Sequence, residues 1–190
     1  LGRRLLPLLL AEEQHDAAAV RRLAAAGTEL PEGALGAVVL DRELETILRF
    51  ADEVRQATAA PVLPPHQAQV PIAIEGESWR VQAGFADLRP QGLVRWRYDE
   101  ERARDVLEAW ITHLVLCADP PPGIRPATQW LSLGQPRRFE PVADAPEQLA
   151  ALVRLYRRGL CEPLPFFPKA AWSYASEGRN NLRALLAHPG

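Results

Sequence analysis

Apolar side chains recur at intervals of three and four residues in several long stretches of the chain and alternate with polar side chains between them. The helical spacing covers residues 16–26, a longer stretch from residue 35 to the prolines near residue 61, and residues 144–159. The clearest helical stripe consists of Val106, Leu107, Trp110, Ile111, Leu114 and Val115. This spacing predicts four helices that each bury one face against a core.

Strands are predicted on both sides of the third helix. Three of them precede it, over residues 69–75, 78–88 and 93–98, and a hairpin of residues 128–133 and 138–142 follows it. The order of helices, three-stranded antiparallel meander, helix, hairpin and helix indicates an α+β fold.

Composition indicates a soluble globular protein and disfavours a free-standing DNA binder. The 190 residues are 47% hydrophobic and carry a formal net charge of −2, whereas DNA-binding domains are usually basic. No apolar run approaches the roughly 20 residues of a membrane span, and the apolar stretch 5–10 contains Pro7 and lacks the cleavage pattern of a signal peptide. Cys117 and Cys161 lack metal-ligand spacing, so we expect two buried free thiols in a cytoplasmic protein. Because the chain begins at Leu1 and contains no methionine, we expect a piece of a longer polypeptide.

Asp87, Arg95 and Arg97 lie on two neighbouring predicted strands, where nucleases of the PD-(D/E)xK type carry their active site. Such a site needs an acid on the first strand and acid-x-Lys on the second; the chain resembles this pattern with Arg95 replacing the second acid and Arg97 the lysine. Magnesium takes oxygen ligands, and a guanidinium about 4 Å away would repel it by about 8 kcal/mol at an effective dielectric of about 20. Arginine does not lose its proton. We therefore predict a PD-(D/E)xK nuclease-like core with a degenerate active site and no metal; the alternative is an ordinary ion-paired sheet face.

The turn between these two strands predicts how the three side chains meet. Pro90 suits the first central position of a type I turn, and Gly92 suits the left-handed residue of a following G1 bulge. Such a three-residue loop would place Asp87 opposite Arg95 as a cross-strand ion pair. A two-residue loop would instead place Asp87 opposite Val94.

His113 lies beside the apolar stripe of the third helix. No nearby Ser, Cys or acid forms a nucleophile arrangement with it, so we expect a partly buried, hydrogen-bonded histidine and not a catalytic base.

Four segments of the chain resemble, in order, the C-terminal domain of the RecC family, the gamma chain of exodeoxyribonuclease V. They are residues 30–36, 92–97, 110–118 and 156–164, within matches that run from about residue 16 to 175. The Arg-Trp-Arg sequence of the third predicted strand belongs to the pattern of this family, whereas Asp87 departs from it.

The resemblance implies a non-catalytic subunit domain of the RecBCD helicase–nuclease, which processes double-strand breaks for homologous recombination. RecB and RecD would be its partners together with DNA, without a cofactor or a membrane. We expect residues 1–60 to form an N-terminal helical part and residues 61–190 the nuclease-like α/β core with C-terminal helices, all in one domain. Two alternatives remain open: an active metal-dependent nuclease using Asp87 with an acid from elsewhere, and a protein-interaction module without DNA contact. Glu75, Glu77 and Glu108 are the candidate acids, and none has the required spacing.

Strand parting in the RecC family involves a projecting element of this region, and the hairpin 128–142 is a candidate for it. Trp130, Arg137, Arg138 and Phe139 would then contact DNA, since an aromatic side chain that stacks on an unpaired base contributes about 1–3 kcal/mol. The alternative is that these residues only complete the fold.

Phe166 and Phe167 lie between two prolines, so they cannot both face one core from a regular element. One of them, together with Trp172 in a short helix predicted after them, is a candidate contact with RecB or RecD. The alternative is that they anchor the last helix internally.

Overall fold

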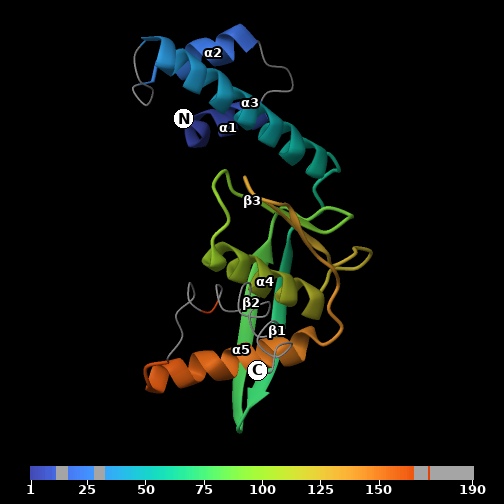
Figure 1. The fold of residues 1–190 in the computed structure, drawn as a ribbon. Helices are drawn as coiled ribbons and strands as arrows, with labels where there is room; N and C mark the ends of the chain where they lie inside the picture. The colour runs from blue at the N-terminus through green and yellow to red at the C-terminus, as the bar shows by residue number, and fades with distance from the viewer. Residues whose placement is uncertain (12–16, 28–32, 165–170, 172–190) are drawn as a thin grey trace, which may run out of the picture.

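The computed structural model describes residues 1–11, 17–27, 33–164 and 171 of the chain (Figure 1). Five helices and five strands are named within these residues, and this mixture confirms the α+β class. None of the helices among them is long and apolar enough to cross a membrane. The short helix predicted around Trp172 lies outside the described residues.

Three helices form the N-terminal part: α1 (Gly2–Ala11), α2 (Ala17–Ala25) and α3 (Gly33–Ala57). The sequence predicts α2 and α3 but not α1, which contains Pro7 and so lacks one backbone hydrogen bond. Leu5, Leu6 and Leu9 are nevertheless buried in a cluster with α3. Packing of this apolar face compensates for the proline, as tertiary contacts do for most short helices.

The strands form two small sheets and are β1 (His66–Ile74), β2 (Glu77–Phe85), β3 (Leu93–Trp96), β4 (Thr128–Leu131) and β5 (Arg137–Phe139). β1 and β2 make a long antiparallel hairpin, whereas β3 pairs parallel with β4, and β4 pairs antiparallel with β5. The predicted three-stranded meander is therefore wrong at its third strand. A parallel pair needs a long crossover connection, and α4 (Ala103–Ala118) provides it between β3 and β4.

The β1–β2 hairpin buries one face beneath α4 and α5 (Ala145–Cys161), which lie across it in Figure 1. Along β1 every second side chain from Ala68 to Ile74 is buried, the alternation typical of a half-buried strand. These side chains share a hydrophobic cluster with Leu114 of α4 and Leu149 of α5.

The β3–β4 pair has two different faces. Val94 and Leu131 belong to the buried cluster of the N-terminal helices. Arg95 and Trp130 are paired in register on the two strands and line a cavity together with residues of α4. Because side chains alternate along a strand, one small sheet contacts the N-terminal helices on one side and α4 on the other.

The two cysteines differ in their surroundings. Cys117 is half-buried, Cys161 is exposed, and both are free thiols, as predicted. The expected burial of Cys161 is wrong because the buried side chains of α5, Ala145 and Leu149, lie in its first turns, far from this last residue.

Candidate functional site

Asp87 and Arg95 form the predicted ion pair. Asp87 lies in the bend after β2, and Arg95 lies within β3. Both side chains are partly exposed, with relative exposures of 45% for Asp87 and 31% for Arg95. The carboxylate that a metal ion would require is therefore already bound to a guanidinium.

The turn before β3 has a two-residue loop, so the predicted three-residue loop is wrong. Arg89 and Gly92 exchange two backbone hydrogen bonds, with N–O distances of 3.0 and 2.8 Å. This turn was expected to place Asp87 opposite Val94 and so prevent the ion pair. The pair forms nevertheless, because no strand pairing extends from this bridge to Asp87 and the long Arg95 side chain reaches the carboxylate.

Gly92 allows this turn to lie directly against the chain that leads into β4. Its φ of +117° is a conformation that favours glycine. A Cβ atom at this position would lie 2.1 Å from the carbonyl oxygen of Ala127. The same oxygen accepts a hydrogen bond from the Leu93 N–H at 2.9 Å, so Gly92 permits the close approach at which β3 and β4 begin to pair.

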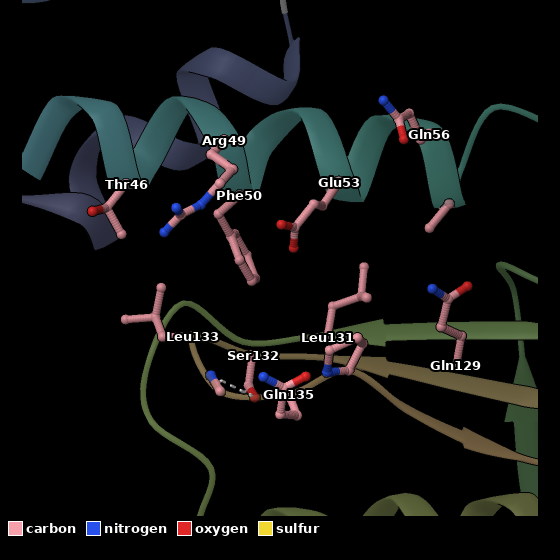
Figure 2. A pocket seen from close by; sticks show the side chains of 13 residues that line it. Thr46, Arg49, Phe50, Glu53, Gln56, Gln129, Leu131, Ser132, Leu133 and Gln135 are labelled. Atoms are coloured by element: carbon pink, nitrogen blue, oxygen red, sulfur yellow. Dashed lines mark hydrogen bonds between the residues drawn. The ribbon is translucent and has the colours of Figure 1, made fainter.

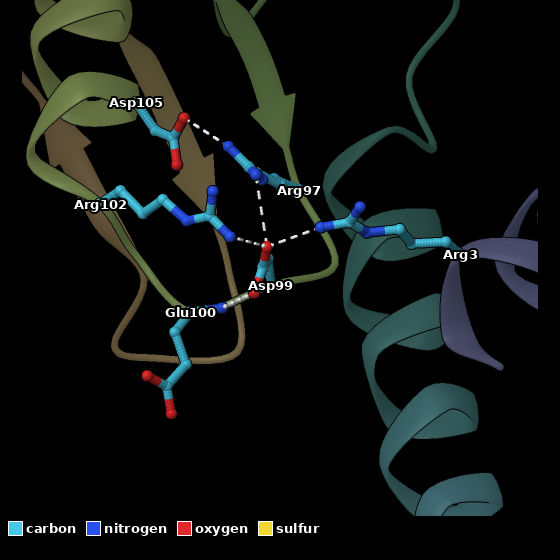
Figure 3. Close-up of polar contacts among 6 residues, drawn as sticks. All are labelled: Arg3, Arg97, Asp99, Glu100, Arg102 and Asp105. Carbon is cyan, nitrogen blue, oxygen red and sulfur yellow. Dashed lines mark hydrogen bonds and ion pairs between the residues drawn. The ribbon is translucent and has the colours of Figure 1, made fainter. Parts of the chain in front are cut away.

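Arg97 belongs to a second ion-paired group, which Figure 3 shows between α1, α4 and the end of β3. Its guanidinium donates to the buried Asp105 at 2.6 Å and contacts Asp99 at 3.3 Å. Arg3 and Arg102 donate to the same oxygen of Asp99 at 2.8 and 2.7 Å. The three predicted site residues are thus divided between two groups, and this second group connects the N-terminal helices to the core.

Asp99 is held in its charged form by this group. The backbone N–H of Glu100 donates to its carboxylate at 2.9 Å. This bond lowers the pKa of Asp99 below its ordinary value of 3.8, and Arg3, Arg102 and Arg97 act in the same direction against the effect of burial.

A cavity of about 310 Å³ lies beside both groups, between the end of β3 and α4. Arg95, Arg97, Asp105 and Glu108 are among the side chains that line it. No group of three or more His, Cys, Asp or Glu side chains in the described part of the chain could hold a metal ion. Because Asp87 and Asp105 each bind a guanidinium, these side chains do not fit the oxygen cage that Mg²⁺ requires.

His113 is fully buried and hydrogen-bonded through both ring nitrogens. Its Nε2 donates to the carbonyl oxygen of Glu140 at 2.9 Å, so Nδ1 accepts from the Thr128 hydroxyl at 3.0 Å. Burial lowers the pKa of His113 below its ordinary value of 6.5. The predicted hydrogen-bonded histidine is present and is more deeply buried than expected.

The sequence interpretation missed a thiol beside this histidine. The Sγ atom of Cys117 lies 3.4 Å from Nε2 of His113 and 3.3 Å from the carbonyl oxygen of Pro126. Their spacing of four residues on one helix was the available signal. Burial raises the pKa of Cys117, which disfavours the thiolate that a cysteine nucleophile needs.

The candidate DNA-contacting residues of the β4–β5 hairpin are engaged within the protein. Trp130 is buried, and Phe139 packs against the ring of Trp110 with centroids 5.4 Å apart. Arg137 donates to both carboxylate oxygens of Glu101, at 2.5 and 2.6 Å, and Arg138 pairs with Glu140 at 2.9 Å. The two aromatic side chains thus pack inside the domain, while the side chains of Arg137 and Arg138 remain 44% and 55% exposed.

The turn of this hairpin faces α3 across a cavity of about 520 Å³ (Figure 2). Arg49, Phe50 and Glu53 of α3 point toward Leu131 and the turn residues that follow it. No local sequence pattern indicates this cavity, because its two walls lie about 80 residues apart in the chain. In Figure 1 the β1–β2 hairpin, and not this one, extends away from the N-terminal helices.

The candidate partner contacts Phe166, Phe167 and Trp172 lie outside the described residues. The sequence interpretation also missed Asp99 and Asp105, the two carboxylates that bind Arg97. Their closeness in sequence to Arg97 was the only available signal.

The fold and the site together define a class: an α+β domain in which Arg95 and Arg97 bind the carboxylates of Asp87 and Asp105. The chain belongs to the family of RecC C-terminal domains, whose model matches residues 1–179. It is 30% identical over 170 residues to "RecBCD enzyme subunit RecC" of Escherichia coli (strain K12), a match that covers 84% of this chain and 14% of the relative. The chain thus spans about one-seventh of the length of that curated relative.

Proposed function

We propose that this domain is a non-catalytic part of the RecBCD exodeoxyribonuclease V, where it supports the assembly and handles DNA strands during double-strand break repair and homologous recombination. Its partners are RecB, RecD and DNA, and its location is the cytoplasm. Membership of the RecC family supports this assignment. The proposal that the domain is non-catalytic rests on two ion pairs, Arg95 with Asp87 and Arg97 with Asp105.

We further propose that the core descends from a PD-(D/E)xK nuclease. A hairpin, a strand, a crossover helix and a parallel strand follow one another, and the ion pair between Asp87 and Arg95 supports the proposal. In this view the arginines replaced the metal as the positive charge that neutralises the remaining carboxylates.

A surface for the partner subunits is proposed at the end of α5. Leu155, Tyr156 and Leu160 are 41%, 61% and 64% exposed there. This apolar surface directly precedes the segment with Phe166 and Phe167, and exposed apolar patches commonly mark protein interfaces. For DNA we propose Arg137 and Arg138, with Trp130 and Phe139 holding their strand in place.

The first experiment tests catalysis. The purified 190-residue chain is incubated with linear DNA and Mg²⁺ or Mn²⁺, next to Asp87→Ala and Glu108→Ala variants. We expect no cleavage by any of the three proteins. Metal-dependent cleavage that Asp87→Ala abolishes would establish the alternative of an active nuclease. Glu108 is the candidate acid chosen for substitution because it lines the cavity of about 310 Å³ beside Arg95 and Arg97. The other two candidates, Glu75 and Glu77, bind Arg157 near the tip of the β1–β2 hairpin.

The second experiment separates the DNA-handling domain from a pure protein-interaction module. Binding of single-stranded DNA is measured at low salt, and capture of the chain by purified RecB and RecD is measured in parallel. We expect both. Leu160→Glu should reduce capture but not DNA binding, whereas Arg138→Glu should reduce DNA binding but not capture. Capture without any DNA binding would favour the interaction module.

A further inference from the structure

Trp96 is an exposed aromatic side chain between two cavities. It is 39% exposed at the end of β3. It lines the cavity of about 310 Å³ beside α4 and also one of about 250 Å³ beside α1. A tryptophan in this position offers a flat apolar surface on which another ring can stack.

The cavity beside α4 is also lined by residues with unused hydrogen-bonding groups. The Glu108 carboxylate forms no hydrogen bond or ion pair within the described part of the chain. The indole N–H of Trp130 and Oδ2 of Asp105 also have no hydrogen-bond partner among the same residues, but both atoms are buried and are not accessible from the cavity. The carboxylate of Glu108, an exposed residue, is therefore the acceptor that this wall offers to a ligand.

Charge around this cavity disfavours an anion. The positive charges of Arg95 and Arg97 are matched by Asp87 and Asp105, and Glu108 adds an unmatched negative charge. A phosphate group at this position would meet a free carboxylate. The ligand that fits is a planar, uncharged ring whose edge carries hydrogen-bond donors.

We propose that this cavity binds one unpaired nucleobase of single-stranded DNA, stacked on Trp96 with its edge toward Glu108. The inference rests on the proposed DNA-handling function and adds the part of the strand that is bound. Trp96 and Glu108 thus recognise the base, and the phosphates stay outside the cavity.

The test compares a labelled 12-nucleotide single strand with the same strand carrying abasic residues, by fluorescence anisotropy. Stacking contributes about 1–3 kcal/mol per base, so Trp96→Ala should weaken binding of the normal strand about 5- to 150-fold. Binding of the abasic strand should not change. Trp96→Phe should retain most of the affinity, and Glu108→Gln should weaken binding of the normal strand several-fold. Leu35→Ala, which truncates an apolar side chain 68% exposed on α3, is the control and should have no effect.

Salt dependence provides an independent readout. Trp96→Ala should leave the slope of log affinity against log salt unchanged, since that slope reports phosphate contacts. Equal binding of normal and abasic strands, with no effect of Trp96→Ala, would show that phosphates alone hold the strand; the inference would then be wrong and the proposed function would stand. Failure of the folded wild-type chain to bind either strand would contradict both. Thermal unfolding of each variant confirms that it is folded.

Discussion

The two faces of the β3–β4 pair differ in chemistry although they belong to the same few residues. On the face toward the N-terminal helices, Val94 and Leu131 are buried among aliphatic side chains. On the face toward α4, Arg95 and Trp130 line a cavity, and Thr128 binds a buried histidine. One face therefore holds the domain together by apolar burial, while the other carries polar side chains that line a cavity and bind one another.

This difference shows where the N-terminal helices obtain their stability. Their buried cluster is completed by side chains of β3 and β4, and Phe50 of α3 packs edge-on against Tyr98 with ring centroids 5.4 Å apart. The ion pair between Arg3 and Asp99 lies at the same boundary. We therefore expect the helical part and the core to unfold together, and to depend more on the apolar face than on the polar one.

The largest expected effect is that of Leu131→Ala on the apolar face. Removing a buried leucine costs about 2–5 kcal/mol, so the free energy of unfolding in urea should fall by that amount in a single transition. Leu149→Ala, a buried leucine of the other cluster, is the control and should cost a similar amount. Two separate transitions in Leu131→Ala, with only α1–α3 losing protection from hydrogen exchange, would contradict a shared core.

Gly92→Ala tests the point at which both faces begin. A residue held at this strained φ costs about 1–3 kcal/mol, and the new Cβ would also meet the Ala127 carbonyl oxygen. We expect the free energy of unfolding to fall by more than that range. Gly123→Ala is the matched control, because Gly123 has a φ of +78° and no atom within 4 Å of an added Cβ. If the two variants lose equal stability, the contact between Gly92 and the Ala127 carbonyl oxygen adds nothing to the cost of the strained φ.

Asp105→Ala tests the polar face. Asp105 is buried and accepts a hydrogen bond from the guanidinium of Arg97, whose side chain is 33% exposed. Hydrogen bonds to charged groups contribute about 1.5–3 kcal/mol, so we expect a loss in the lower part of this range in thermal or urea unfolding. Asp87→Ala is the control, since an ion pair as exposed as Asp87–Arg95 contributes at most about 1 kcal/mol. Equal losses would mean that burial does not distinguish the two pairs.

The elements that depend on local sequence were predictable, and those that depend on distant partners were not. The apolar stripe of α4 and the alternation along β1 each reflect one buried face, so the sequence predicts both elements. The parallel pairing of β3 with β4 was missed because neighbouring strands along the chain usually pair with each other. For α1, Pro7 hid a helix that only packing against α3 makes stable.

The candidate site shows the same division. The ion pair between Asp87 and Arg95 was predicted from residue types, although the turn geometry used to justify it was wrong. The sequence could not reveal that Arg97 turns to Asp105, because the helix that carries this acid is positioned by the core. The exposure of Trp96 likewise depends on where α1 and α4 leave space around the end of β3.

The smallest effect concerns His113 and the pH dependence of stability. Burial lowers its pKa in the folded protein below the ordinary value of 6.5, so the unfolded chain binds more protons as the pH falls below that value. Stability should therefore be complete above about pH 6.5 and decrease as the pH falls below that value, with a slope of at most about 1.4 kcal/mol per pH unit. Urea unfolding at several pH values measures this slope, and the loss stops growing once the pH passes below the folded pKa. His113→Gln should remove the slope, whereas His66→Gln, on β1 outside this face, should keep it. A slope that persists in His113→Gln would mean that the polar face tolerates a charged imidazole, and that the contrast between the two faces is smaller than their side chains indicate.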